Sequence, residues 1–263
     1  MNVSVLVWAV TCAVILGLFV FDFYAHVRVP HEPTFRESAI WSSVYIGLAV
    51  VFGLVVWWLW GGEFAGEYFA GYVTEKALSV DNLFVFTVIM ATFAVPREFQ
   101  QKLLLIGIVM ALVMRAGFIA VGAAAISTFS WVFYIFGIFL VLTAAKLARE
   151  AGHEKEVEEE RDSRIIALVR RFVNKTDEYE GDKFLTTVDG KRAVTPMLLA
   201  LIAIGFTDLL FALDSIPAIY GLTEEPYIVF TANAFALMGL RQLYFLIGGL
   251  LDRLGYLSYG LSL

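Results

Sequence analysis

The sequence predicts an all-α polytopic membrane protein, a helical bundle that contains an inverted three-helix repeat. Hydrophobic residues make up 60% of the 263 residues and aromatic residues 15%, and the mean hydropathy is +0.77. An ordinary soluble domain is only about half apolar. Two further observations, a series of long apolar windows and a pair of matching acidic segments, predict the number of helices and the repeat.

Seven apolar windows are long enough to cross the roughly 30 Å hydrocarbon core of a bilayer as helices. They cover residues 3–24, 40–60, 72–94, 103–125, 128–148, 195–221 and 227–250. The first is interpreted as a spanning helix and not as a cleavable signal peptide, because no positively charged segment precedes it. After Asp252 and Arg253 only LGYLSYGLSL remains, so we expect the sequence to stop inside an eighth helix, with helices 3–5 and 6–8 forming the repeat.

The predicted organisation has three parts: helices one to five in residues 1–148, a charged cytoplasmic loop in 149–194, and helices six, seven and the start of eight in 195–263. Eleven of the nineteen Lys and Arg residues lie between Lys146 and Arg192, whereas the links GGEFAGEY and LTEEPY have none. The positive-inside rule therefore places the N-terminus outside and the 149–194 loop in the cytoplasm. We expect a multi-pass protein of the bacterial inner (plasma) membrane.

Ionisable residues inside the windows indicate where a functional site lies, because each costs on the order of 3 kcal/mol in a bilayer and requires a partner or a role. Seven charged residues have at least three window residues on either side: Glu75, Lys76, Asp81, Arg115, Asp208, Asp214 and Arg241. Glu75 and Lys76 are the weakest candidates, because they lie near the expected outer end of the third helix, where a long side chain can extend to the interface.

Two of the windows carry matching segments, EKALSVDNLFVF from Glu75 and DLLFALDSIPAI from Asp208. Each has an acidic residue, five intervening residues, an aspartate and then a small amide or hydroxyl side chain. One helix later each half has a methionine, an arginine and a glycine: Met114, Arg115 and Gly122 in the first, and Met238, Arg241 and Gly248 in the second. The second segment lies three helices after the first, so the two run in opposite directions, as in transporters with inverted repeats and central binding sites.

Proline in the second segment adds a metal-binding group. Pro217 is expected to break the helix: it has no N–H, so the carbonyl oxygen of Leu213 loses its helical donor beside Asp214. We expect a central metal site formed by Asp81, Asn82, Asp214, Ser215 and the carbonyl of Leu213. Each first acid precedes its aspartate by six residues, which turn a helix by about 600°. Glu75 and Asp208 are therefore expected on helix faces about 120° away from those of Asp81 and Asp214. These two acids are expected to line the pathway or take up protons, with Arg115 and Arg241 balancing charge.

Oxygen ligands favour a hard cation. His26, His31 and His153 fall in expected loops or at helix ends, and the single cysteine, Cys12, lies in an apolar stretch. The segments therefore lack the imidazole and thiolate ligands that zinc and copper prefer, whereas manganese, magnesium and calcium all suit the oxygen ligands. The metal is expected as a transported substrate, with the lipid bilayer as the other partner. No organic cofactor and no nucleic acid is expected, and assembly as a homo-oligomer or in a membrane stress complex stays open.

The chain is not expected to be an enzyme, because it has no nucleotide-binding glycine loop, no nucleophile with a histidine base and no metalloprotease motif. Secondary transport in exchange for protons fits, because a proton and a divalent cation compete for the same carboxylate oxygens. Two alternatives stay open. One is a membrane scaffold or stress protein that supports metal loading of other proteins, with the acids as structural ion pairs. The other is an exporter of organic solutes, although few neutral polar side chains lie in the windows.

Two long motifs resemble the TerC family of integral membrane proteins, of the TerC/Alx type. They are EKALSVDNLFVF followed by FAVPREFQ, and TDLLFALDSIPAIYGLT followed by EEPYIVFTANAFALMGLRQLYFLIGGL, and the similarity extends along most of the chain from Trp41. The resemblance implies inverted three-helix repeats, manganese efflux, metal homeostasis and an association with tellurite resistance. The functional acids that it implies are Glu75, Asp81, Asp208 and Asp214, with Asn82 and Ser215 beside the central aspartates.

This chain departs from the family pattern at Gly205, where many relatives have an acidic residue. A fully acidic pathway is therefore in doubt. Family members also continue through further helices after the SYGL segment. Tellurite itself is not expected as a substrate, because an oxyanion requires a net positive pocket or helix N-termini.

Overall fold

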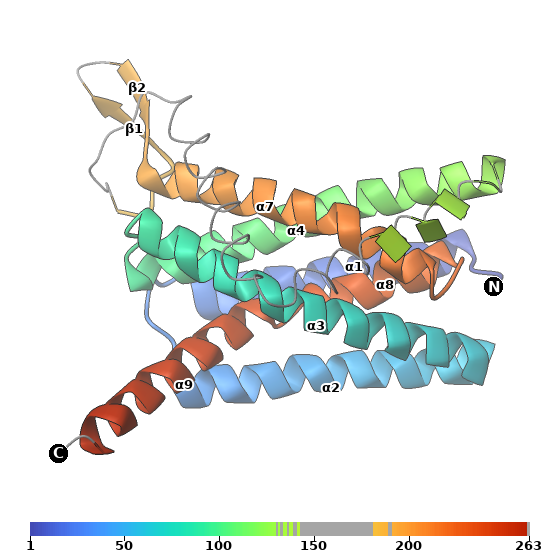
Figure 1. The fold of residues 1–263 in the computed structure, drawn as a ribbon, viewed down its shortest axis with the longest axis horizontal. Helices are drawn as coiled ribbons and strands as arrows, with labels where there is room; N and C mark the ends of the chain where they lie inside the picture. Colours follow the sequence, from blue (N-terminus) through green and yellow to red (C-terminus); the bar gives the residue numbers. More distant parts are fainter. Residues whose placement is uncertain are drawn as a thin grey trace.

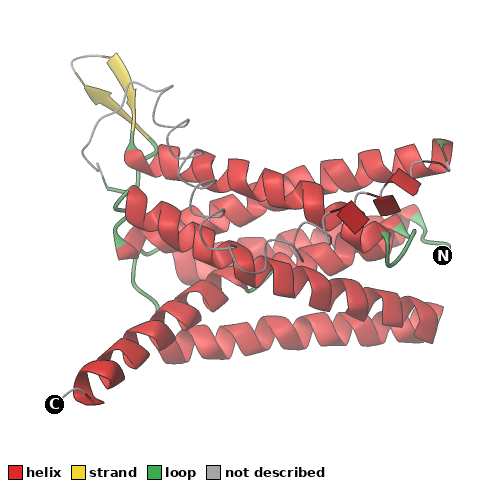
Figure 2. Cartoon of the chain, viewed as in Figure 1, coloured by secondary structure: helices red, strands yellow, loops and turns green. Residues whose placement is uncertain are grey.

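The computed structural model describes residues 1–129, 181–188 and 191–261, together with residues 131, 134, 135, 137, 138, 141 and 142. This part of the chain is almost entirely helical (Figure 2). Its elements are α1 (Val5–Asp22), the π-helix η1 (Phe23–Val27), α2 (Phe35–Trp60), α3 (Gly62–Thr92), α4 (Arg97–Thr128), β1 (Leu185–Val188), β2 (Lys191–Val194), α7 (Pro196–Tyr220), α8 (Pro226–Leu237) and α9 (Leu240–Leu261). The predicted helix 128–148 and most of the predicted loop 149–194 lie outside the described residues.

Five helical segments are long and apolar enough to cross a membrane: Val5–Val27, Phe35–Trp60, Arg97–Thr128, Pro196–Tyr220 and Pro226–Leu250. They confirm five of the predicted windows. Helix α3 has 31 residues and covers the window 72–94 up to Thr92, but it carries more charge than the other described helices. Large apolar side chains remain exposed on the outer helices, for example Val5 at 85% and Trp58 at 84%. Such a surface suits lipid and not water.

Side-chain caps define where several helices begin. The hydroxyl groups of Ser4, Thr34 and Thr195 accept hydrogen bonds from backbone N–H groups in the first turns of α1, α2 and α7. Helix α7 also has Pro196 in its first turn, where the missing N–H costs nothing. These starts agree with the sequence windows to within a few residues.

A single residue connects α2 to α3, where the sequence analysis predicted a longer loop. The segment GGEFAGEY was expected to be an extracellular link, but α3 begins at Gly62 and includes nearly all of it. Gly61 alone reverses the chain, with φ at +98°, a conformation that glycine adopts without steric cost. Glu75 consequently lies near the middle of α3 and not near its outer end.

Two more boundaries near the C-terminus differ from the prediction. The window 227–250 is two helices, because α8 ends at Leu237 and α9 begins at Leu240. Gly239 lies in the left-handed region, with φ at +79°, and this conformation ends α8. The predicted turn at Asp252 and Arg253 is also wrong: α9 continues through both residues to Leu261, so the final segment is not the start of a separate helix.

Pro217 does not interrupt its helix. Helix α7 continues through this proline to Tyr220, so the expected helix break is wrong. A proline in the last turn removes one donor but leaves most of the helical hydrogen bonds in place. The carbonyl of Leu213 still has no N–H donor at position 217.

Helix directions set the arrangement of the bundle (Figure 1). Helix α3 runs opposite to α2 and α4, whereas α4 and α7 lie side by side and run in the same direction. Gly107 of α4 contacts Ile204 of α7, and Gly122 contacts Tyr220 further along both helices. The matching segments on α3 and α7 therefore lie on antiparallel helices, which is a necessary condition of an inverted repeat. Strands β1 and β2 pair as an antiparallel hairpin at one end of the bundle.

Candidate functional site

Three helices bring two acids onto one arginine in the middle of the bundle. Arg115 of α4 donates from Nη1 to Glu75 Oε2 of α3 at 2.6 Å, and from Nη2 to Asp208 Oδ1 of α7 at 3.0 Å. Its Nε donates to the second oxygen of Asp208 at 3.3 Å. A two-pronged contact of this kind uses the fixed fork of the guanidinium. We call Glu75, Arg115 and Asp208 the Arg115 cluster.

The Arg115 cluster is closed off from the surface. The exposed fraction is 0% for Glu75, 1% for Arg115 and 2% for Asp208. The sequence identified these three residues as buried charges, but it ranked Glu75 among the weakest candidates. That ranking is wrong, because it assumed a helix that begins at residue 72.

Charge is not balanced in the Arg115 cluster. When both acids are ionised, two negative charges face one positive charge, and Glu75 Oε1 has no hydrogen-bond partner among the described residues. A buried polar oxygen without a partner costs roughly 1–3 kcal/mol, and more when charged. The cluster therefore has a place for a proton or another cation.

Further buried polar atoms without partners lie on the same helices. Ser79 Oγ on α3 and Ser215 Oγ on α7 have no hydrogen-bond partner, and both residues are buried. Ser79 and Asn82 follow Glu75 along one face of α3, and Ser215 follows Asp208 along one face of α7, because four and seven residues bring a helix back to nearly the same direction. Native interiors rarely leave such groups unpaired, so these faces indicate a site for water or an ion.

The two predicted central aspartates are placed by their helices only. Asp81 lies on α3 and Asp214 on α7, while their side chains lie outside the described part of the structure. Asn82 and Ser215, next to them, are buried. Among the described residues, no group of three or more His, Cys, Asp or Glu side chains is arranged to hold a metal ion. The predicted metal site with Asp81 and Asp214 stays a prediction.

Arg241 lies in a different cluster from the one that the sequence predicts. Its Nη2 donates to Asp22 Oδ1 at 2.7 Å and its Nη1 donates to Gln101 Oε1 at 2.5 Å. Tyr45 and Gln242 also donate to Asp22 Oδ1, at 2.8 and 3.1 Å. Arg241 therefore balances Asp22, whereas Glu75 and Asp208, the described acids of the matching segments, pair with Arg115. We call Asp22, Tyr45, Gln101, Arg241 and Gln242 the Arg241 cluster.

Sequence reasoning missed Asp22. This residue is 6% exposed, but it lies two residues from the end of the first apolar window, where an acid is ordinarily taken to reach water. Its partner, Arg241, lies more than two hundred residues away in the sequence. The sequence analysis assigned that arginine to the acids of the matching segments and so did not look for another acid.

Lys76 points away from the Arg115 cluster. Its Nζ donates to the carbonyl oxygens of Ala236 at 3.0 Å and Met238 at 3.3 Å. These carbonyls lie at the break between α8 and α9. Lys76 was expected to reach the interface, and this expectation is wrong, because the lysine binds backbone oxygens inside the bundle.

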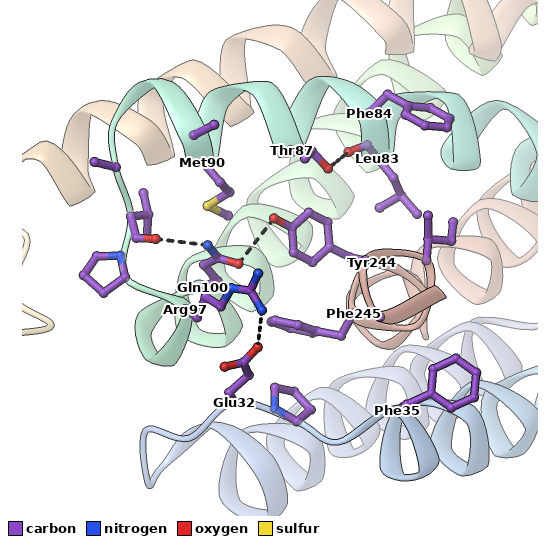
Figure 3. A pocket seen from close by; sticks show the side chains of 18 residues that line it. Glu32, Phe35, Leu83, Phe84, Thr87, Met90, Arg97, Gln100, Tyr244 and Phe245 are labelled. Carbon is purple, nitrogen blue, oxygen red and sulfur yellow. Dashed lines mark hydrogen bonds and ion pairs between the residues drawn. The ribbon is translucent and has the colours of Figure 1, made fainter. Parts of the chain in front are cut away.

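A cavity of about 610 Å³ opens between the second half of α3, the start of α4 and α9 (Figure 3). Its walls are mainly apolar, with Phe84 and Phe245 among them. Polar groups gather on one side: Gln100 donates to the carbonyl of Val95 at 3.0 Å, and Tyr244 donates to Gln100 Oε1 at 3.3 Å. An ion pair between Arg97 and Glu32, 2.7 Å long, lies on the same side.

Outside the spans, the β hairpin is tied to the bundle by an ion pair. Lys102 Nζ at the start of α4 donates to Asp182 Oδ2 at 2.6 Å. This hydrogen bond holds the pKa of Asp182 below its usual range. Both side chains are partly exposed, so the pair contributes little to stability.

The fold and its buried charges define a multi-pass helical membrane protein with ionised groups inside the bundle. Residues 60–263 match the family model described as the integral membrane protein TerC family. The chain therefore belongs to the TerC family, as the two motifs predicted.

Curated relatives are membrane proteins as well. One from Mycobacterium bovis is 54% identical over the whole chain, which covers 66% of that relative. One from Myxococcus xanthus is 40% identical over 97% of the chain and 79% of the relative. The Escherichia coli protein named as a membrane-bound redox modulator, Alx, is 36% identical over 89% of the chain and 75% of the relative. The chain thus spans just under two thirds of the mycobacterial relative, and no solved structure matches it.

Proposed function

We propose that this protein is a secondary transporter that exports manganese from the cytoplasm, in exchange for protons. One observation carries the proposal: Glu75 and Asp208, both fully buried, share a single guanidinium, and one oxygen of Glu75 has no partner. Burying an uncompensated carboxylate costs several kcal/mol. A site that retains this excess negative charge inside a membrane is suited to a cation.

The metal would bind further along the same two helices. Asp81 with Asn82 on α3, and Asp214 with Ser215 and the Leu213 carbonyl on α7, supply carboxylate, amide, hydroxyl and carbonyl oxygens. Manganese, magnesium and calcium accept such ligands, and family membership favours manganese among them. In this proposal α3 and α7 are the equivalent helices of an inverted repeat, which their antiparallel directions support.

The Arg115 cluster would couple metal to protons. Glu75 and Asp208 bind Arg115 when no metal is present, and a proton on either acid releases the guanidinium from part of its ion pair. A proton and a metal ion compete for carboxylate oxygens. Arg115 is thus the internal counter-charge of the metal-free state, whereas Arg241 has no such role because its carboxylate partner is Asp22.

The proposed orientation has the N-terminus outside and the 149–194 loop in the cytoplasm of a bacterium. The α1–α2 link, the α3–α4 link and the β hairpin lie at the same end of the bundle (Figure 1). Lys and Arg residues lie in or directly beside these segments, as they do at cytoplasmic links: Arg28 and Arg36, Arg97 and Lys102, and Lys191 and Arg192. The α2–α3 and α7–α8 links, which have no Lys or Arg, lie at the other end.

A second candidate function is a membrane scaffold that supports metal loading of other proteins, or tellurite resistance. The ion pairs of Arg115 and Arg241 favour it, because a purely structural role would satisfy both arginines in this way. The name of the Escherichia coli relative concerns redox. Cys12 is the single cysteine of the chain and is exposed, so a redox effect would be indirect, for example through metal supply. Neither candidate involves catalysis.

Cellular manganese distinguishes the two candidates. Mass spectrometry would measure the metal in a manganese-loaded, exporter-deficient bacterium that expresses the wild type, Asp81→Asn, Asp214→Asn or Glu75→Gln. We expect the wild type to lower cell manganese at least twofold and the three variants to lose most of this effect. The matched control is Glu32→Gln, an equally isosteric change at a half-exposed acid, which should export normally.

Membrane abundance must be equal in all strains. Export by the Asp81→Asn and Asp214→Asn variants at the wild-type rate would refute the metal site. If the wild type itself leaves cell manganese unchanged, the scaffold becomes the better account.

A further inference from the structure

The break between α8 and α9 presents backbone oxygens inside the bundle. Helix α8 ends at Leu237, and Met238 is extended, with φ at −61° and ψ at 134°. The last carbonyl groups of a helix have no helical donor and carry a partial negative charge of roughly half an electron. In transporters with broken helices, such carbonyls coordinate the coupling cation.

Here an ammonium group occupies that place. Lys76 Nζ lies 3.0 Å from the Ala236 oxygen and 3.3 Å from the Met238 oxygen. Among the described side chains no carboxylate pairs with Lys76, unlike Arg115 and Arg241. Within the described part of the chain, the hydrogen bonds of this ammonium go to backbone carbonyls, as the ligand contacts of a small monovalent cation would.

The cavity of Figure 3 lies along the same face of α3. Leu83, Thr87 and Met90 line it, and they follow Lys76 by seven, eleven and fourteen residues, which places all four side chains on one side of the helix. The opposite wall belongs to α9, the helix that begins at the break. The cavity therefore lies on the approach from the α3–α4 end of the bundle toward Lys76.

We propose that the α8–α9 break is a binding position for a monovalent cation, and that the ammonium of Lys76 is its built-in occupant. The carbonyl oxygens of Ala236 and Met238 are the ligands, and the partial negative charge at the C-terminal end of α8 attracts the cation. A lysine carries its charge on a flexible stem, so it can leave the position when α3 moves, and a free sodium ion then competes for it. This site is separate from the Arg115 cluster and does not depend on manganese export.

The test is thermal unfolding of the full chain in lipid nanodiscs, in sodium chloride against choline chloride at equal ionic strength. Lys76→Met removes the charge and keeps an unbranched side chain. We expect the variant to unfold earlier than the wild type in choline, and sodium to raise its unfolding temperature by about 3–5 °C in a saturable manner. The wild type, whose position is filled, should give the same temperature in both salts. Equal temperatures for the variant in both salts would overturn the proposal.

Three further variants keep the test decisive. Lys102→Met removes an ammonium that pairs with a carboxylate, and sodium recovery of the same size there would show a general ionic effect and refute the site. Lys76→Arg keeps the charge and should stay insensitive to sodium. Lys76→Gln replaces Lys76→Met if the latter does not fold, with the same expected recovery. The readout contains no manganese, so its failure is distinct from failure of the transport proposal.

Discussion

The Arg115 and Arg241 clusters contain the same kind of residue in similar surroundings, but they are built differently. Arg115 has two carboxylate partners and leaves one of their oxygens free. Arg241 has one carboxylate partner, Asp22, whose Oδ1 also accepts hydrogen bonds from a tyrosine and a glutamine. The first cluster carries excess negative charge, whereas the charges of Arg241 and Asp22 cancel. A buried arginine therefore pairs with two carboxylates in one place and with a single carboxylate in the other.

The largest expected effect follows removal of Arg115. Arg115→Gln leaves Glu75 and Asp208 buried with no positive partner, and we expect the free energy of unfolding to fall by about 4 kcal/mol. Asp208→Asn in the same chain should restore about half of this loss, because one carboxylate then remains. Thermal unfolding in nanodiscs measures both. If the second change adds to the loss, the cluster does not carry excess negative charge.

Neutralising one acid in each cluster tests the comparison directly. Asp22→Asn leaves Arg241 unpaired and should cost about 3 kcal/mol. Glu75→Gln leaves Arg115 paired with Asp208 and should cost less than about 1 kcal/mol, because the charges then balance. The same unfolding assay applies. Equal losses in the two variants would mean that the clusters do not differ in charge.

A smaller effect is expected at the α8–α9 break beside the Arg241 cluster. Gly239→Ala places a Cβ in the left-handed region, 3.0 Å from the Tyr45 side chain, and should cost about 1–2 kcal/mol. Gly248→Ala is the matched control, because its Cβ would meet no atom within 4 Å. This control should leave stability unchanged or raise it slightly. A Gly239→Ala protein as stable as the wild type would show that the break relaxes freely.

The smallest effect concerns an exposed ion pair, as a contrast to both buried clusters. Lys102 lowers the pKa of Asp182 in the folded protein. The pair therefore stabilises the fold fully above about pH 4, which is the pKa of an aspartate in the unfolded chain. This contribution disappears as the pH falls through the lower pKa of the folded state. We expect at most about 0.5 kcal/mol. Wild type and Asp182→Asn, compared between pH 3 and pH 6, should differ only at the upper end. A difference that grows toward pH 3 would reverse the sign and contradict the assignment.

Hydropathy was sufficient for the spans, because lipid requires about twenty apolar residues in a row. It could not show that the α2–α3 turn is a single residue, and it did not find the α8–α9 break. Each depends on one glycine, Gly61 or Gly239, with a positive φ, and hydropathy does not report backbone conformation. The same limit explains the misplaced turn at Asp252, where charged residues continue a helix as readily as they end one.

The sequence predicted several residues of the candidate site, but it did not predict which of them pair with one another. Rarity of charge in apolar windows identified Glu75, Arg115, Asp208 and Arg241. It could not assign Arg241 to Asp22 or Lys76 to the α8 carbonyls, because those partners are distant in sequence. The sequence also does not show which backbone carbonyl oxygens lack a helical donor.

By itself, the sequence determined that this protein is a helical membrane protein of the TerC family with charges inside its bundle. Those properties follow from composition, from window length and from local motifs. Only the tertiary structure decided which charges meet, since pairing depends on how long helices cross and on which face each side chain occupies. The excess acid at Arg115, the balance at Arg241 and the ammonium at the α8–α9 break are consequences of packing, and the cost of leaving a charge unpaired in the bundle interior makes each of them specific.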